Sequence, residues 1–363
     1  MKINKFSKNS HNPLKDFNMH IRNKKNIINS ISIFLSPVIA ILFAFILAGL
    51  VVLISGGNPL NAYSSLIKGA FGSLSGLKNT LRFTLPIIFL ALSFSITARC
   101  GLFNIGQDGQ LIASALTVVS IPVFFPNISE FSQVLIMVLL GALAGAFVAL
   151  IPTLLKIWLG INEVVVAILL NYLLINFSSY ILAYTALGNP NSSYIMSNRI
   201  QPTLSPSIII MTALLVVLGY ALTLRFSVPG YHLRMVGKNY LFARSSGIKA
   251  TKIIISASLI GGALSGLVAV GELLGVYHIM YDGFITGMGN NGIMAAIIGQ
   301  NSPLGMILSS MVLGSLQSGS VLLSVATDVP AEIVIVVQGF VMLFATVSVK
   351  SVINRFRGNN NGS

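Results

Sequence analysis

Long runs of apolar residues alternate with short polar segments along most of the chain. A helix needs about 20 predominantly apolar residues to cross the hydrocarbon core of a bilayer. Backbone groups in lipid must find their hydrogen-bond partners internally, which favours helices over open strands. We therefore expect an all-α integral membrane protein with about ten transmembrane helices, at 34–54, 83–98, 111–125, 134–155, 164–184, 208–224, 253–274, 292–298 with its flanks, 304–325 and 333–349.

The composition supports this interpretation. The chain has 363 residues, of which 55% are hydrophobic and 8% are charged, whereas a soluble domain carries about 25% charged residues. No long stretch has the mixed composition of a soluble catalytic domain. The net charge of +14 does not indicate nucleic acid, because the cations lie in short segments between apolar runs. Cys100 is the single cysteine, which excludes an internal disulfide.

The distribution of cations predicts the orientation. Cytoplasmic segments of membrane proteins are enriched in Lys and Arg. With ten spans and both termini in the cytoplasm, 18 of the 22 Lys and Arg residues fall inside. The predicted external segments hold the other four, Lys68, Lys78, Arg82 and Arg199. We thus expect a multi-pass protein of the cell membrane, with a basic cytoplasmic arm at 1–30, a membrane domain at 31–350 and a cytoplasmic tail at 351–363.

The segment "GLFNIGQDGQ" at 101–110 is unusually polar for its place between two apolar runs. Asn104, Gln107 and Gln110 offer hydrogen-bond donors and acceptors that suit ribose hydroxyls or base edges, and Asp108 lies among them. Polar groups at membrane depth are tolerated where they are buried in protein or face water. Two interpretations stay open. The segment lines the transport pathway, or it is a tight cytoplasmic turn.

Other polar residues interrupt the apolar runs. Asn171 is either a hydrogen-bonding contact between helices or a contact for the substrate. Glu163 begins the predicted span 164–184 and suits the positive end of the helix dipole there. Asn290 and Asn291 lie between glycines before a short apolar run, and such interrupted segments often mark a transport pathway.

A polar and aromatic group surrounds "LLGVYHIMY" near the predicted external end of a span. Tyr277 and Tyr281 suit an aromatic belt at the membrane interface, or an outer vestibule that stacks a base. Glu272 and Asp282 flank this segment, and His278 lies within it. A metal site needs more ligands than His278 and scattered acids provide, so we expect no metal here.

The cytoplasmic loop 225–252 contains signals for a short helix. Asn239 is a good N-cap and Gly247 a good stop, which leaves room for about two turns at 240–246. Such a helix could dock into a groove of another protein. The alternative is an ordinary basic loop held near anionic lipid.

Several motifs resemble a known family. They are "FNIGQDGQ" at 103–110, "INEVVVAILLNYLLINF" at 161–177, "LRMVGKNYLFARSSGIKATKIIISASLIGGALSGLVAV" at 233–270 and "GFITGMGNNGIMAAIIGQNSPLG" at 283–305. In this order they resemble permease subunits of bacterial ABC importers for branched-chain amino acids, simple sugars and nucleosides, and the nucleoside branch most. The resemblance covers 83–347. One departure is "YLF" at 240–242, where relatives often have a Pro-Glu-Ala-like run.

The resemblance implies a permease that forms a nucleoside pathway by alternating access. It implies an ATPase subunit with tandem nucleotide domains, which would bind ATP and Mg, a second related permease in a heterodimer, and an extracellular lipid-anchored binding protein. It assigns contact with the ATPase to Gly237, Asn239, Tyr240, Phe242, Arg244 and Gly247. Importers of simple sugars or branched-chain amino acids are the alternatives within the family.

The chain contains no phosphate-binding loop of the Gly-x-x-x-x-Gly-Lys-Ser/Thr type. It therefore cannot hydrolyse ATP alone, and we expect a transport subunit without a cofactor of its own, not an enzyme. An ion-coupled secondary transporter is the alternative from another class, although its acids would be expected deeper in the spans.

Two segments carry the same small-residue spacing. Gly141 and Gly145 lie four residues apart, as do Gly262 and Gly266, and this spacing allows close packing of membrane helices. The two segments are traces of two pseudo-related halves or independent packing motifs.

Overall fold

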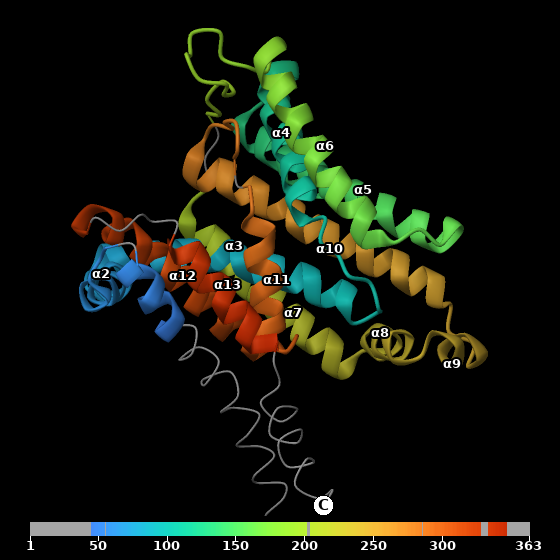
Figure 1. Ribbon diagram of the computed structural model, residues 1–363. Helices are drawn as coiled ribbons and strands as arrows, with labels where there is room; N and C mark the ends of the chain where they lie inside the picture. The colour runs from blue at the N-terminus through green and yellow to red at the C-terminus, as the bar shows by residue number, and fades with distance from the viewer. Residues whose placement is uncertain (1–44, 55, 202–203, 285, 328–332, 347–363) are drawn as a thin grey trace, which may run out of the picture. The chain divides into compact units, whose positions relative to one another are not determined.

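The computed structural model describes residues 45–54, 56–201, 204–284, 286–327 and 333–346. This part of the chain is mostly helical (Figure 1), and extended pairing within it is limited to isolated bridges. A helix covers Phe45–Ile54. It is followed by α2 (Pro59–Phe71), α3 (Leu74–Ala98), α4 (Gln107–Phe124), α5 (Glu130–Leu159), α6 (Glu163–Tyr184) and α7 (Pro206–Phe226). Then come α8 (Val228–Lys238), α9 (Tyr240–Ser245), α10 (Ala250–Glu272) with the π-helical turn η1 (Leu273–Tyr277), α11 (Met288–Ile298), α12 (Pro303–Ala326) and α13 (Ile333–Thr346).

The chain divides into two compact units. The larger comprises Val52–Val334, and the smaller comprises the two ends, Met1–Val51 and Ile335–Ser363. The predicted arm at 1–30 and the predicted tail at 351–363 lie outside the described residues. The sites considered below all belong to the larger unit.

Each predicted span coincides with a helix wherever the structure describes it. Five described helices are long and apolar enough to cross a membrane, namely α3, α5, α6, α12 and α10 extended through η1. A sixth is possible if α7 and α8 form one broken span, since the two are bent by 73° at Ser227. The described helices thus establish a multi-pass membrane protein.

The segment before the second predicted span is not the loop that we expected. It forms α2 and the first two turns of α3, so that Lys68, Lys78 and Arg82 are helical. Ser73 explains the early start of α3, because its side chain accepts a hydrogen bond from the N–H of Gly76 at 3.0 Å. Such a cap begins a helix at a given residue, whereas the apolar run begins only where the cations end.

Helix α11 is shorter than a membrane span. It has 11 residues, which is about 16 Å at 1.5 Å per residue, against a hydrocarbon core of about 30 Å. Gly287 before it has a positive φ of 80°, and Gly299 follows its last residue. Two breaks therefore confine this apolar run to a half-helix.

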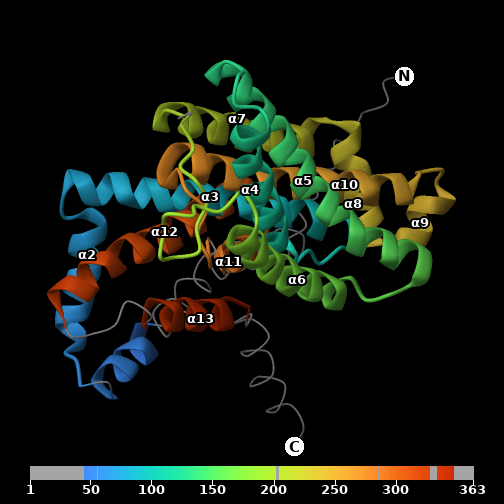
Figure 2. The ribbon, with the colours of Figure 1, turned by 90° about the horizontal axis from the view of Figure 1, so that it is seen from above.

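Helices α3 and α10 form the centre of the larger unit and pack on each other. Each is followed by a loop and two further helices, α4 and α5 after α3, and α11 and α12 after α10. The packing is exchanged between these two series: α3 packs on α11 and α12, and α10 packs on α4 and α5 (Figures 1 and 2). The two series therefore have the same order along the chain and exchanged packing partners, while the two pseudo-related halves stay a prediction.

The two glycine pairs meet in one interface between α5 and α10. A Cβ atom on Gly145 would lie 2.4 Å from the carbonyl oxygen of Gly262 and 2.9 Å from Cα of Gly266. A Cβ on Gly266 would lie 2.5 Å from the carbonyl oxygen of Gly141. The two motifs are therefore alike because they pack against each other. They do not occupy equivalent places, since α5 corresponds to α12 in the exchanged arrangement.

Candidate functional site: the junction of α4, α6 and α11

The polar segment 101–110 forms the loop after α3 and the first turn of α4. Asn104 organises this loop, because its Oδ1 accepts hydrogen bonds from the N–H of Gly106 at 3.1 Å and from Nε2 of Gln110 at 2.9 Å. Gln110 is fully buried. The amide pair thus fixes the chain direction where α4 begins.

Asn171 on α6 joins this loop through both atoms of its amide. Its Oδ1 accepts from the N–H of Gly109 at 2.8 Å, and its Nδ2 donates to the carbonyl oxygen of Ile105 at 3.0 Å. A Cβ on Gly109 would lie 2.8 Å from that Oδ1. Of the two roles considered for Asn171, these bonds correspond to the hydrogen-bonding contact between helices.

Asp108 caps a helix from another part of the chain. The N-cap of α11 is Gly287, which has no side chain to cap the helix. The Asp108 carboxylate accepts from the N–H of Gly289 at 2.7 Å and from the N–H of Gly287 at 3.3 Å. A negative group is favourable at a helix N-terminus. One side chain therefore connects the start of α4 with the start of the half-helix α11.

Gln107 lies beside Asp108 and has no exposed surface. Its Nε2 donates to the carbonyl oxygen of Leu90 on α3 at 2.8 Å. Its Oε1 is buried and has no hydrogen-bond partner among the described residues. A buried polar atom without a partner is uncommon, so this oxygen is an unsatisfied acceptor inside the junction.

The remaining two predicted pathway residues lie on the first turn of α11. Asn290 is exposed, whereas Asn291 is 7% exposed. Five of the seven predicted residues therefore lie on, or bond to, the segment 101–110, although only Asn104 and Gln110 bond each other directly. The five are Asn104, Gln107, Asp108, Gln110 and Asn171.

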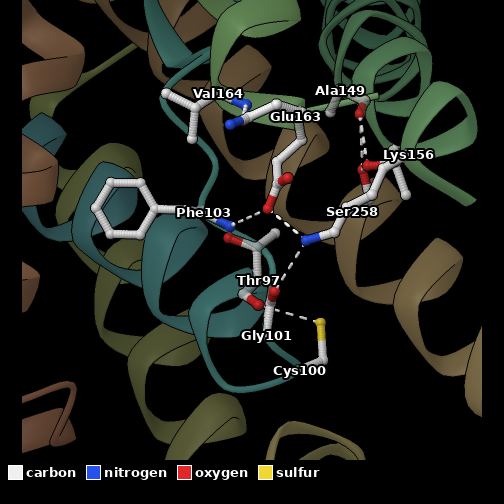
Figure 3. Close-up of polar contacts among 11 residues, drawn as sticks. Thr97, Cys100, Gly101, Phe103, Ala149, Lys156, Glu163, Val164 and Ser258 are labelled. Carbon is white, nitrogen blue, oxygen red and sulfur yellow. Dashed lines mark hydrogen bonds and ion pairs between the residues drawn. The ribbon is translucent and has the colours of Figure 1, made fainter. Parts of the chain in front are cut away.

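An ion pair that we did not expect lies next to the same loop (Figure 3). Oε1 of Glu163, at the start of α6, accepts from Nζ of Lys156 at 2.5 Å and from the N–H of Phe103 at 3.4 Å. Lys156, near the end of α5, also donates to the carbonyl oxygen of Gly101 at 3.3 Å. Glu163 is thus more than a partner of the helix dipole. The sequence signal for this ion pair is that Lys156 and Glu163, of opposite charge, lie on either side of the helix break at Gly160.

Cys100 is buried directly below this ion pair and is 3% exposed. Its Sγ donates to the carbonyl oxygen of Thr97 at 3.1 Å (Figure 3). Burial raises the pKa of the thiol to about 11, although two backbone hydrogen bonds and the Lys156 charge oppose this shift. A thiol of this kind is inert at neutral pH.

The predicted short helix in the loop 225–252 is present as α9. The side chain of Asn239 accepts from the N–H of Phe242 at 2.9 Å, and Gly247 follows the helix with a φ of 81°. Leu241 and Phe242 are 71% and 55% exposed. The helix therefore presents apolar side chains and the exposed cation Arg244 outward.

The preceding helix α8 was not predicted. Ser227 caps it by accepting from the N–H of Gly230 at 3.2 Å. A Cβ on Gly237 would lie 2.0 Å from the carbonyl oxygen of Arg99 at the end of α3. The structure thus gives Gly237 a packing role, which joins the base of α9 to the loop that contains Asn104.

At the other end of α10, three aromatic rings pack edge to face. Tyr277, Tyr281 and Phe284 have centroids 5.5–6.0 Å apart. The ring of Phe284 is fully buried. Oδ1 of Asp282 accepts from Oγ of Ser179 on α6 at 2.5 Å. The two tyrosines therefore belong to an aromatic cluster within the protein.

Comparisons with known proteins agree with these features. The family described as "Branched-chain amino acid transport system / permease component" matches residues 76–346. The chain is 31% identical to the nucleoside ABC transporter permease protein NupB of Lactococcus lactis, over 86% of this chain and 90% of that protein.

Two further relatives are similar over most of their length. The chain is 29% identical to the guanosine ABC transporter permease protein NupP of Bacillus subtilis, over 88% of this chain and 95% of that protein. It is 27% identical to the glucose ABC transporter permease protein TsgB13 of Haloferax volcanii, over 86% and 87%. No solved structure matches the chain. The chain belongs to the family of permease components of branched-chain amino acid transport systems.

Proposed function

We propose that this chain is the membrane permease subunit of an ATP-driven importer and that it forms the translocation pathway for nucleosides. The observation that carries the substrate class is the similarity to nucleoside and guanosine permeases over nearly the whole of both chains. A simple sugar is the second candidate, because a glucose permease is similar over a comparable length.

In this proposal the chain crosses the membrane about ten times, with α11 and its flanking segments counted as one crossing, and both termini are cytoplasmic. The excess of Lys and Arg in the predicted internal segments supports this orientation. The ends of α3 and α5 and the helices α8 and α9 then face the cytoplasm. The ends of α6 and α10 face the outside.

Helix α9 is proposed to contact a separate ATPase subunit. Its exposed Leu241 and Phe242 suit a hydrophobic groove, since an amphipathic helix commonly docks in this way. Gly237 packs on the end of α3, so a displacement of α9 would reach the loop of Asn104. Asn239, Tyr240, Arg244 and Gly247 complete the proposed contact.

The junction of α4, α6 and α11 is proposed to lie on the pathway. Asp108 joins the start of α4 to the start of α11, and Asn171 joins the start of α4 to the third turn of α6, while the buried Oε1 of Gln107 is an unsatisfied acceptor beside them. Helix starts that meet at membrane depth are a common feature of transporter sites. Gln110, Asn104, Asn290 and Asn291 are proposed as neighbours of the pathway.

The proposed partners are an ABC ATPase that binds ATP and Mg, a second related permease and an extracellular binding lipoprotein. The family consists of permease components, and a permease without a phosphate-binding loop needs an ATPase to be driven.

Uptake of radiolabelled guanosine, adenosine and uridine by cells with and without the gene tests the substrate class. We expect the deletion to lose uptake, the restored gene to recover it, and excess unlabelled glucose or ribose not to compete. Unchanged nucleoside uptake in a strain without other nucleoside carriers contradicts the proposal. Competition by sugar moves the assignment to the second candidate.

A charge reversal on α9 tests the coupling. Arg244→Glu is expected to abolish uptake while the protein stays in the membrane, because it changes the charge of the docking face. Lys252→Glu is the matched control, since Lys252 is an equally exposed cation on the first turn of α10. Normal transport by the Arg244→Glu variant would contradict the proposed contact between α9 and the ATPase.

A further inference from the structure

A cavity of about 650 Å³ lies between α3, α7 and α10, away from the junction described above. Its lining includes Arg82, Leu85 and Phe89 from α3, Ile210 from α7, and Val268 and Glu272 from α10. Ligand sites in proteins have volumes of about 300–1,000 Å³ and are mostly apolar with a few polar groups. The cavity has this character, because its walls are mostly apolar and its polar lining consists of Lys78, Asn79, Arg82 and Glu272.

Glu272 is the first of these polar groups. Its side chain lines the cavity and is 7% exposed. It makes no hydrogen bond within the described residues, and the opposite charge that acts on it is Arg82. An ionised carboxylate only accepts hydrogen bonds, and burying one without partners is costly. Glu272 is therefore an acceptor that is open to a ligand.

Arg82 on α3 is the complementary group. Its Nε is buried and has no hydrogen-bond partner among the described residues. Its guanidinium carbon lies 5.2 Å from the ring centres of both Phe83 and Tyr277, so the aromatic rings hold its plane. A guanidinium only donates hydrogen bonds. The cavity lining thus contains a donor, Nε of Arg82, as well as the acceptor Glu272.

We propose that this cavity is a binding site for a nucleoside in transit, an inference that rests on the proposed function. The ribose hydroxyls donate to Glu272, an acceptor on the base faces Arg82, and the base lies against Phe89 and the aliphatic walls. In the proposed orientation the cavity belongs to the outer half of the protein, where the substrate arrives.

Other ligands fit less well. The phosphate of an anionic lipid could pair with Lys78 or Arg82, but it would leave the buried Glu272 carboxylate without a hydrogen-bond donor. A monosaccharide has only a small C–H face for Leu85 and Val268 and would leave much of the cavity of about 650 Å³ empty. A zwitterionic amino acid matches both charges, but it is small for a cavity of about 650 Å³.

Gly271 allows a variant that fills the cavity without disturbing the packing. It lines the cavity, and a Cβ there would meet no atom within 4 Å. Gly271→Leu therefore occupies ligand volume while Glu272 and Arg82 stay in place. Gly219→Leu is the matched control, because Gly219 on α7 is exposed, outside the cavity lining, and equally open. For Glu272→Gln, the control is Glu130→Gln on the exposed first turn of α5.

The experiment is equilibrium binding of radiolabelled guanosine to the assembled permease–ATPase complex in nanodiscs, without the binding protein. We expect Gly271→Leu and Glu272→Gln to raise the guanosine Kd at least tenfold, and both controls to stay within twofold of the unaltered complex. Thermal unfolding of each variant identifies any that fail to fold.

Each contrary outcome overturns a different statement. Equal guanosine Kd values in all variants, with normal nucleoside uptake, overturn the cavity as the site and leave the proposed function standing. Displacement of the bound guanosine by leucine or glucose, but not by adenosine, overturns the assignment of a nucleoside to this cavity. A phospholipid retained by the unaltered complex and lost from Gly271→Leu, as seen by native mass spectrometry, also overturns it. Absence of nucleoside uptake by the unaltered importer refutes the proposed function itself.

Discussion

Replacing Asp108 by alanine removes the cap of α11 without touching α11 itself. The carboxylate accepts two backbone N–H groups at 2.7 and 3.3 Å, and the helix has no cap of its own. Without this carboxylate, the N–H groups of Gly287 and Gly289 have no acceptor at a half-buried position. The variant is therefore expected to loosen the start of α11 and the loop at 101–110 together.

The magnitude follows from two contributions. Loss of an N-cap side chain costs about 0.5–2 kcal/mol, and a partly buried charge at a helix terminus contributes up to about 2 kcal/mol. We expect Asp108→Ala to destabilise the protein by about 2–4 kcal/mol on this basis. Asp108→Asn keeps one acceptor oxygen and loses the charge, so its loss should be about half as large.

Thermal unfolding of the detergent-solubilised protein measures this effect. Asp282→Ala is the control, because this exposed carboxylate accepts from Ser179 and caps no helix. A Cβ on Gly289 would lie 2.8 Å from Oδ1 of Asp108, so Gly289→Ala should cost less in the Asp108→Ala background than alone. Equal stability of the Asp108 and Asp282 variants, or additive effects of the Gly289 and Asp108 changes, refutes the reasoning.

Three further predictions concern other contacts. Cys100 should resist labelling by maleimide at pH 7 until the protein is unfolded. Between about pH 9 and pH 11 the thiol is deprotonated in the unfolded chain but still protonated in the native chain. The free energy of unfolding should therefore fall as the pH rises through this range. Lys156→Glu and Glu163→Lys should each lower the free energy of unfolding. In a double-mutant cycle the double exchange should recover about 0.5–1 kcal/mol of it. Additive effects of the two single changes contradict the ion pair. Gly145→Ala should lower stability by about 1–3 kcal/mol through overpacking against α10, whereas Gly219→Ala, with no neighbour within 4 Å, should not.

Features set by local signals were predictable from the sequence. The bounds of α9 follow from Asn239 and Gly247, whose preferences act within a single turn. Conversely, α2 and the start of α3 were not predicted. Lys78 and Arg82 lower the hydropathy of this segment, whereas the start of the helix depends on the Ser73 cap. Apolarity locates a span but does not locate its ends.

Contacts between distant segments were not predictable. The segment 101–110 stood out by composition, yet the partner of Asp108 lies 181 positions away at Gly289. The cavity of Glu272 and Arg82 depends in the same way on the packing of α3 against α10. Residue types indicated that these groups were unusual, but only the fold shows which of them meet.

The exchanged packing of α3 and α10 has a consequence for how the chain is made. Helix α3 ends at Ala98, whereas its neighbours α11 and α12 begin only at Met288 and Pro303, and α4 and α5 meet α10 only from Ala250 onward. Neither series can complete a core of its own during synthesis. Helices α4 and α5 can pack on each other early and on α10 once it is made, whereas the packing of α3 is completed last, when α11 and α12 have been added.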